Sequence, residues 1–541
     1  MNFKPFLVIS GIGMVGIGLW AGCSVSRHRP AVIQSPGSVS SRPQPAAGIA
    51  SRLIIHADQP GGKISRNLYG QFSEHLGRCV YDGIWVGEDS SIPNTRGIRN
   101  DVVAALKKIR VPVLRWPGGC FADEYHWMDG IGPRDLRPTR INTTWGGVAE
   151  NNQFGTHEFL DFCDQIGAAP YISGNVGSGT VEELMQWIEY MTATTNSVMS
   201  DLRRQDGRKE PWKIPFVGVG NESWGCGGEM TPEYYSDNFR RYNAFVKDYP
   251  GNKIYRIASG SNGDDTNWTD VLMKNVGTRM SGLSLHYYTL PTGNWKNKGS
   301  DLAFGEVEWF STLERALKMD DLVSRHSAIM DRYDPQKKVG LIVDEWGAWY
   351  DAAPGSNLGI LYQQNTLRDA LVAGTTLNIF NRHCDRVKMA NIAQLANVLQ
   401  AMVLTDKEKM IVTPSYHVFE MYVPHQDATL LPSEMQSADY SFGDEKIPAV
   451  SASASRDKAD RIHVTLCNLN PNQPAEVTCE LRGAKAQTLS GRVLTAPEMT
   501  AHNSFDQPEA VKPAGFNAFR VTPGGFVTTL PPKSVVVLQV E

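Results

Sequence analysis

Two stretches of the sequence decide the fold that it predicts. Residues 216–228, FVGVGNESWGCGG, begin as an apolar run punctuated by glycine and then change abruptly to an amide and a carboxyl, Asn221 and Glu222. Residues 339–347, VGLIVDEWG, repeat this design and place Asp344 and Glu345 after a second apolar run. A buried strand that delivers polar groups to a cavity has this pattern. We therefore expect both runs to be strands whose ends face one site.

The same design recurs along the chain and predicts an α/β fold, a (β/α)8 TIM barrel. Short apolar strands alternate with helical patterns, and this alternation favours a closed parallel barrel. The alternative is an open doubly wound sheet, but no strand is followed by the glycine-rich phosphate loop typical of that fold. The predicted strands end near residues 70–72, 114–116, 171–173, 219–221, 257–259, 285–287, 342–344 and 379–381.

The C-terminal part of the chain has a different pattern. Alternating apolar and polar residues separated by Asn, Pro and Gly turns predict an antiparallel, jelly-roll-like β-sandwich over residues 415–541, after a catalytic barrel over residues 65–414. A lone strand precedes the barrel, and its unpaired edge must be satisfied elsewhere. We therefore expect residues 52–64 to cross over and join the sandwich.

The N-terminus predicts an export signal. Lys4 precedes an uncharged apolar run, and residues 19–23, LWAGC, resemble a bacterial lipoprotein box that would place a lipid on Cys23. Simple cleavage and retention as a membrane anchor are the alternatives. We assign residues 1–23 to this signal and residues 24–51, rich in Ser and Pro, to a flexible linker. On this interpretation the protein is exported to the periplasm or the outer surface and attaches to the membrane through its N-terminus.

Composition and cysteine spacing limit the partners. A hydrophobic content of 41% and a net charge of -4 over 541 residues describe a globular protein without the basic surface that nucleic acid requires. None of the 8 cysteines has metal-ligand spacing. Cys467 and Cys479 fall on segments that look like neighbouring strands. They are therefore the pair that we predict first as a disulfide.

Two strand-end carboxyls facing one cavity suit the hydrolysis of a glycosidic bond. Glu222 follows an apolar strand, so desolvation would keep it protonated as a general acid, whereas Glu345 would stay ionised as the nucleophile. Only one of Asp344 and Glu345 can face the cavity, because neighbouring side chains on a strand face opposite sides. We assign Glu345, the later residue, to the cavity and expect Asp344 to be a structural hydrogen-bonding group. The alternative interpretation is that each carboxylate sits at the barrel rim and is paired with an arginine.

Other polar residues at strand ends are candidates for binding a sugar. Glu74, Arg115 and Asn221 offer donors and acceptors for hydroxyl groups, and the alternative for them is a buried layer of ion pairs. His286 is expected to form hydrogen bonds and not to bind a metal, since no second His or Cys stands at ligand spacing. Tryptophans near the strand ends are either platforms for sugar stacking or core packing. They are Trp116, Trp145, Trp224 and Trp346.

Five ordered motifs resemble glycoside hydrolase family 51 α-L-arabinofuranosidases. They are residues 68–79 (LYGQFSEHLGRC), 114–123 (LRWPGGCFAD), 220–228 (GNESWGCGG), 344–346 (DEW) and 386–395 (RVKMANIAQL). The resemblance runs from about residue 53 to the C-terminus.

This resemblance implies a retaining exo-hydrolase without a cofactor or metal, acting on arabinose-containing polysaccharides or oligosaccharides. By motif position, Glu222 corresponds to the acid/base and Glu345 to the nucleophile. Positions that hold the ring or orient the nucleophile are Glu74, Asn221, His286, Tyr288 and Gln394. One departure is Cys120, which stands where many members have Asn, and a thiol replaces an amide poorly as a sugar ligand.

Two other functions remain open from the sequence. The first is a xylosidase or an endo-glucanase that uses the same two catalytic glutamates. The second is an inactive surface lipoprotein that binds glycans. The insertion between Tyr288 and Val339, which carries Trp295 and Trp309, either shapes the cavity mouth or contacts a neighbouring subunit of a homo-oligomer.

Overall fold

The computed structural model describes residues 49–352 and 359–541. The export signal, Cys23 and nearly all of the expected linker lie outside the described residues. The linker prediction is wrong at its last residues, because strand β1 (Ile49–His56) already begins at Ile49.

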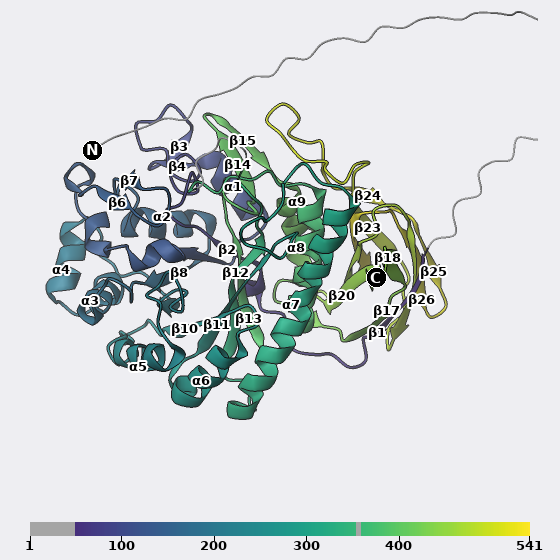
Figure 1. The fold of residues 1–541 in the computed structure, drawn as a ribbon, viewed down its shortest axis with the longest axis horizontal. Helices are drawn as coiled ribbons and strands as arrows, with labels where there is room; N and C mark the ends of the chain where they lie inside the picture. The colour runs from purple at the N-terminus through teal and green to yellow at the C-terminus, as the bar shows by residue number, and fades with distance from the viewer. Residues whose placement is uncertain (1–48, 353–358) are drawn as a thin grey trace, which may run out of the picture. The chain divides into compact units, whose positions relative to one another are not determined.

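Eight parallel strands close into a barrel, which confirms the predicted fold (Figure 1). Around the ring the order is β2, β5, β8, β9, β10, β11, β12 and β13. Their bounds are Gly70–Phe72, Val113–Trp116, Ala169–Gly174, Phe216–Val219, Tyr255–Asn262, Gly282–Thr289, Gly340–Ala348 and Val387–Ala393. Apolar side chains from several of these strands, among them Tyr171 and Ile342, form a buried cluster inside the barrel below the site.

Helices cover the outside of the barrel. Two of them start where the sequence provides a cap: the Thr180 side chain accepts a hydrogen bond from the Glu183 amide, and Thr231 caps a helix that begins with Pro232. The helices are α1 (Asn100–Lys108), α2 (Thr156–Ile166), α3 (Val181–Thr192), α4 (Val198–Gln205), α5 (Pro232–Asn243), α6 (Thr266–Val276), α7 (Glu306–Tyr333), α8 (Leu367–Arg382) and α9 (Pro414–Tyr422). Within the described ranges, no helix is both long and apolar enough to cross a membrane.

The eighth barrel strand is not where the sequence predicted it. Residues 379–381 belong to α8, and the strand that closes the ring is β13. Every residue of α8 from Leu367 to Asn381 is buried. A helix buried on all sides lacks a polar face, so its apolar run has no helical periodicity to distinguish it from a strand.

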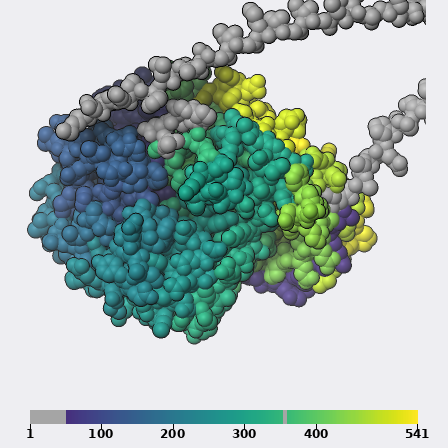
Figure 2. Space-filling model, in the orientation of Figure 1, coloured from purple at the N-terminus to yellow at the C-terminus, as the bar shows by residue number. Residues whose placement is uncertain are grey.

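The C-terminal strands form two facing sheets. One has the order β17, β1, β22, β26, β25, with bounds Ser433–Gln436, Ile49–His56, Ala475–Arg482, Gly525–Leu530 and Phe519–Thr522. The other has the order β16, β20, β21, β27, β23, β24, with bounds Thr429–Leu430, Val450–Arg456, Ile462–Asn468, Ser534–Val540, Leu489–Leu494 and Ala514–Phe516. As predicted, the N-terminal strand β1 joins this sandwich, pairing with β17 and β22. Figure 2 accordingly shows purple N-terminal residues beside green and yellow C-terminal ones.

Four short hairpins complete the described strands. They are β3–β4 (Asn94–Thr95 and Ile98–Arg99), β6–β7 (Arg140–Asn142 and Val148–Glu150), β14–β15 (Val403–Asp406 and Lys409–Val412) and β18–β19 (Asp439–Phe442 and Glu445–Pro448).

The expected disulfide between Cys467 and Cys479 is not formed, and both are free, buried cysteines. Cys467 lies on β21 and Cys479 on β22, and these strands belong to different sheets of the sandwich. Strands adjacent in sequence therefore do not place these two thiols together.

Candidate active site

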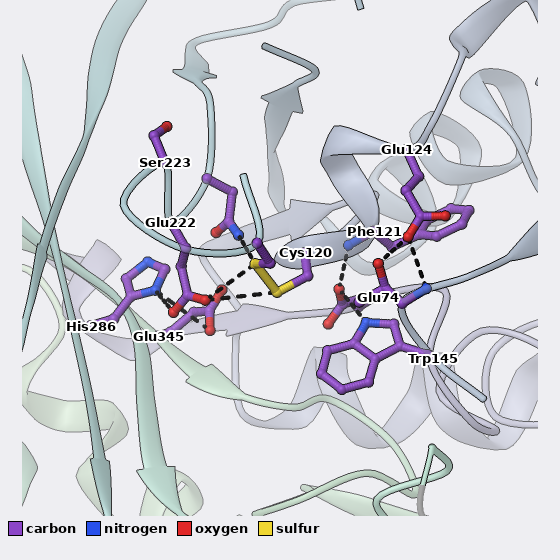
Figure 3. The surroundings of a disulfide bond; sticks show 12 residues. Glu74, Cys120, Phe121, Glu124, Trp145, Glu222, Ser223, His286 and Glu345 are labelled. Carbon is purple, nitrogen blue, oxygen red and sulfur yellow. Dashed lines mark hydrogen bonds and ion pairs between the residues drawn. A yellow bond between two sulfur atoms is a disulfide. The ribbon is translucent and has the colours of Figure 1, made fainter. Parts of the chain in front are cut away.

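A cavity of about 230 Å³ opens at the carboxyl ends of the barrel strands. Both glutamates singled out from the sequence line it, and Figure 3 shows Glu222 and Glu345 side by side. The lining residues are Glu74, Leu76, Gly119, Cys120, Trp145, Glu222, Trp224, Asn262, Tyr288, Trp295, Glu345, Trp349, Leu361, Gln394 and Leu399. The strand-end design therefore brings its two carboxyls to one site.

Glu222 sits on a sharp turn directly after β9. Its φ of 39° lies in the left-handed region, which few residues with side chains adopt, and Gly220 before it has a φ of 92°. The turn aims the carboxyl into the cavity, where His286 Nδ1 lies 2.8 Å from Glu222 Oε1. Burial, followed by the charge of Glu345, raises the pKa of Glu222. A raised pKa favours the protonated carboxyl, which is the form that a general acid needs.

Glu345 has the opposite environment. Arg115 Nη1 donates to Glu345 Oε1 at 2.8 Å, and the Tyr288 hydroxyl donates to Oε2 at 2.9 Å. Both bonds stabilise the ionised carboxylate. The arginine partner foreseen in the alternative interpretation is thus present for Glu345, whereas Glu222 is bonded by His286.

Asp344 is the structural hydrogen-bonding residue that we expected, but its side chain does not face the opposite side of the strand from Glu345. It does not point away from the barrel interior: the Tyr171 hydroxyl donates to Asp344 Oδ2 at 2.6 Å, and His286 Nε2 lies 3.1 Å from Oδ1. The pairing of β12 with β13 shifts register between Val343 and Trp346, so the strict alternation of side chains fails there. Asp344 lies beneath the cavity and Glu345 lines it.

His286 joins the three carboxylates. Burial opposes its protonation, but the charge of Glu345 and the bonds to Asp344 and Glu222 outweigh burial and raise the pKa of His286 to about 10. The imidazole is therefore a cation at neutral pH, and both ring nitrogens donate. This agrees with the hydrogen-bonding role expected from the sequence.

Arg115 and Asn221 lie in the same buried layer. Arg115 is 1% exposed and donates through Nη2 to Asn221 Oδ1 at 2.5 Å, besides its bond to Glu345. The neighbouring carboxylates outweigh its burial and raise the pKa of Arg115. These contacts match the buried layer of ion pairs, which was the alternative interpretation of Arg115. Arg115 therefore influences the cavity through its hydrogen bond to Glu345.

Glu74 forms the opposite wall of the cavity. It accepts hydrogen bonds from the Phe121 amide at 3.0 Å, from Trp145 Nε1 at 2.9 Å and from Gln394 Nε2 at 2.9 Å. Burial, with a smaller contribution from the charge of Glu345, raises the pKa of Glu74 to about 7. Gly119 separates the two carboxylates, and a Cβ there would lie 2.8 Å from Glu345 Oε1.

Cys120 is joined to Cys226 by a disulfide, which the sequence did not predict. It connects the 3-10 helix after β5 (Cys120–Asp123) to the turn that follows Glu222. Figure 3 shows this bond between the pair Glu222 and Glu345 on one side and Glu74 and Trp145 on the other. The two residues are 106 positions apart, and only the meeting of two barrel loops brings them together.

Of the four tryptophans near strand ends, two face the cavity. Trp145 and Trp224 line it, whereas Trp116 and Trp346 are buried in the core. The sequence reading missed Trp349 as a lining residue, although it stands only four positions after Glu345. Trp295 also lines the cavity, so the insertion after Tyr288 does shape its mouth; Trp309 from the same insertion is buried and donates to the Leu469 carbonyl at 2.8 Å.

The separation of the two glutamates defines the class of the protein. One carboxylate oxygen of Glu222 lies within 4.8 Å of one carboxylate oxygen of Glu345, so the two carboxyl groups are close neighbours. Retaining glycoside hydrolases hold their two carboxyl groups about 5–5.5 Å apart, whereas inverting ones need about 6.5–9.5 Å to admit a water molecule. A parallel barrel with two such carboxyls at its C-terminal face has the arrangement that a retaining glycoside hydrolase requires.

Comparison with known proteins gives the family. Two family models match: the α-L-arabinofuranosidase 1 domain over residues 105–311 and the α-L-arabinofuranosidase C-terminal domain over residues 344–534. An intracellular exo-α-L-arabinofuranosidase of Bacteroides ovatus is 52% identical over 91% of this chain and 96% of its own length. The chain belongs to the glycoside hydrolase family 51 α-L-arabinofuranosidases.

Solved structures agree with this assignment. The family 51 arabinofuranosidase of Xanthomonas axonopodis pv. citri is 52% identical, with a TM-score of 0.90 over 91% of this chain and 100% of that one. The α-L-arabinofuranosidase of Thermotoga maritima, solved with arabinose, is 31% identical, with a TM-score of 0.80 over 91% of this chain and 100% of that one.

The expected location is contradicted by one of these relatives. The Bacteroides ovatus protein, which matches nearly the whole chain, is named as intracellular. We therefore withdraw the prediction of export to the periplasm or outer surface with a lipid on Cys23. An apolar N-terminal run that ends in LWAGC resembles a lipoprotein signal, but a short motif match is a hypothesis with a risk of false positives.

Proposed function

We propose that this chain is a retaining, exo-acting enzyme that removes terminal non-reducing α-L-arabinofuranosyl groups from arabinan, arabinoxylan or their oligosaccharides. The observation that carries the proposal is the short spacing of Glu222 and Glu345 together with their opposite environments. A small cavity suits one pentose ring better than the interior of a polysaccharide chain, which supports exo action. The name of the Bacteroides ovatus relative agrees with this mode.

In the first step, Glu345 attacks the anomeric carbon while Glu222 protonates the leaving oxygen. Arg115 and Tyr288 hold the attacking carboxylate in place through its two oxygens. His286 donates to Glu222 Oε1, which leaves Oε2 to carry the transferred proton. The sugar is then bound to Glu345 as an ester.

In the second step, Glu222 changes from acid to base. Formation of the ester removes the negative charge of Glu345, which is one cause of the raised pKa of Glu222. The pKa of Glu222 therefore falls, and its carboxylate takes a proton from the water that attacks the anomeric carbon. The sugar leaves with its configuration retained.

The test replaces each glutamate in turn. Glu345→Ala should lose almost all hydrolysis of an aryl α-L-arabinofuranoside, and added azide should restore turnover with a glycosyl azide of inverted configuration. Glu222→Ala should lose hydrolysis by about 10²–10⁴-fold, and azide should give a product of retained configuration.

Glu229→Gln is the matched control, since Glu229 is an exposed glutamate on the same loop as Glu222. Normal turnover by Glu345→Ala, or the same azide product from both alanine variants, would contradict the assigned roles. Analysis of the products released from branched arabinan and arabinoxylan oligosaccharides tests exo action: internal cuts or release of xylose would overturn it.

A further inference from the structure

The disulfide stands directly beside the proposed acid/base. Cys226 Sγ lies 3.4 Å and Cys120 Sγ 3.7 Å from Glu222 Oε2. His286 binds the other oxygen of Glu222, so Oε2 is held toward the two sulfurs. Sulfur, sulfur and carboxylate oxygen thus converge on one point at the cavity wall, and all three ligand atoms lie within 4.8 Å of one another.

These separations match the coordination shell of zinc. With Zn–S bonds of about 2.3 Å and Zn–O bonds of about 2.0 Å, a tetrahedral site has sulfur–oxygen edges of about 3.5 Å and a sulfur–sulfur edge of about 3.8 Å. Both sulfur–oxygen edges are already near this length. Only the covalent bond between the two sulfurs excludes a metal. The Cα atoms of Cys120 and Cys226 are 5.5 Å apart, so once that bond is broken, rotation of the two side chains can lengthen the sulfur–sulfur distance to the value that zinc requires.

We propose that reduction of the Cys120–Cys226 disulfide creates a site for a thiophilic divalent cation such as Zn²⁺, formed by the two sulfurs and Glu222. A dithiol reductant supplies two electrons and two protons to the disulfide and is itself oxidised to a disulfide. Zn²⁺ then binds the two sulfurs and Oε2, and the two thiol protons and the carboxyl proton of Glu222 pass to solvent. A water molecule from the cavity completes the tetrahedron.

Access to this pair is better than to the other described cysteines. Cys226 is exposed and Cys120 lines the cavity, so both a reductant and a metal can reach them. The five free cysteines among residues 49–352 and 359–541 are all buried. Burial also raises the pKa of Cys79 to about 11 and of Cys467 to about 12, which disfavours the thiolate that a metal requires.

Occupation of the site would inhibit the enzyme reversibly. A metal on Oε2 takes the oxygen that carries the transferred proton, so Glu222 acts neither as acid nor as base. This consequence rests on the proposed function of Glu222, but the metal site itself does not. The two are therefore measured separately.

The experiment compares the full-length chain in two redox states. One sample is kept oxidised, and the other is reduced with a dithiol that is then removed under anaerobic conditions. Zn²⁺ binding is measured by competition with a chromophoric chelator, and turnover is measured on an arabino-oligosaccharide. The reduced sample should bind one additional equivalent per chain and lose turnover by about 10²–10⁴-fold, with recovery on addition of EDTA. The oxidised sample should show neither effect.

Two variants locate the site. Reduced Cys226→Ser should lose the additional equivalent, whereas Cys384→Ser, which removes a buried free cysteine, should retain it. Equal Zn²⁺ binding by the oxidised and reduced samples, or by reduced Cys226→Ser, would overturn the proposal. One equivalent bound with undiminished turnover would support the metal site and overturn the role of Glu222.

Discussion

At the scale of the residue, the site consists of carboxyls whose surroundings set different protonation states. Glu222 and Glu74 are buried near the charge of Glu345, and both have raised pKa values. Asp344 has a lowered pKa, because Arg115 and the bond from His286 outweigh its burial. The cavity and the layer beneath it therefore shift the pKa values of neighbouring carboxyls in opposite directions.

Glu74 gives a prediction about stability. Its pKa rises from an ordinary 4.5 to about 7 on folding. Below pH 4.5 Glu74 is protonated in both the folded and the unfolded state, so its burial as a neutral group does not lower the free energy of unfolding. As the pH rises from 4.5 to about 7, the unfolded state loses the Glu74 proton first, and the free energy of unfolding falls. Glu74→Gln lacks this titration, so it should be more stable than the parent at pH 8 by on the order of 3 kcal/mol, with little difference at pH 4.5.

The amide of this variant fits the site. Gln394 Oε1 is buried without a partner, and rotation of the Gln394 amide would let it accept from the new side chain. Denaturant unfolding at both pH values measures the effect, with Glu229→Gln as the control. A stability difference that does not change with pH would show that the pKa of Glu74 does not rise on folding.

At the scale of the element, strand ends were predictable and loop contacts were not. Asn221, Glu222 and Glu345 could be located because a buried strand must be apolar and a polar residue after it marks its end. The inward turn of Asp344 depends on a register shift against β13, which no local pattern encodes. Trp295 and Cys226 reach the site through loops, and loop paths depend on packing between elements.

We expect the loops after β11 and β12 to bind the aglycone, which is the part of the substrate that leaves when the arabinose is released. Trp295 and Trp349 pack edge to face with ring centroids 5.2 Å apart at the cavity mouth, and Trp295 is 49% exposed. Trp295→Ala should raise the KM for an arabino-oligosaccharide about 3–10-fold, since aromatic packing contributes about 0.5–1.5 kcal/mol. Turnover of methyl α-L-arabinofuranoside, whose small aglycone does not reach the ring, should change little.

The control for the aromatic mouth is Tyr234→Ala, because Tyr234 is 62% exposed on helix α5, outside the cavity lining. Steady-state kinetics on both substrates distinguish the two variants. An equal loss on both substrates would place Trp295 at the sugar ring itself and contradict the aglycone contact.

At the scale of the whole molecule, helix α8 joins the barrel to the sandwich. Its inner side contacts β12, where Phe380 packs on Trp346 at 5.4 Å between ring centroids. Its outer side contacts β20 and β21, and Asn378 Oδ1 accepts from Ser453 Oγ at 3.0 Å and from Thr465 Oγ1 at 2.7 Å. Because α8 has no solvent-facing side over residues 367–381, neither part can leave the other without exposing it. We therefore expect the barrel and the sandwich to unfold together.

Asn378→Ala tests this coupling. The variant removes the acceptor that two buried hydroxyls share, leaves them to donate only to each other and to the Ser453 carbonyl, and should lower the free energy of unfolding by about 1–3 kcal/mol. If the two parts are coupled, loss of activity, which reports the barrel, and loss of far-UV circular dichroism, which reports both parts, should shift to lower denaturant concentration together. Asn267→Ala, on the exposed face of α6, should change stability by less than about 0.5 kcal/mol. Separate transitions in the Asn378 variant, with activity surviving the first, would show instead that the barrel is stable without its contact to the sandwich.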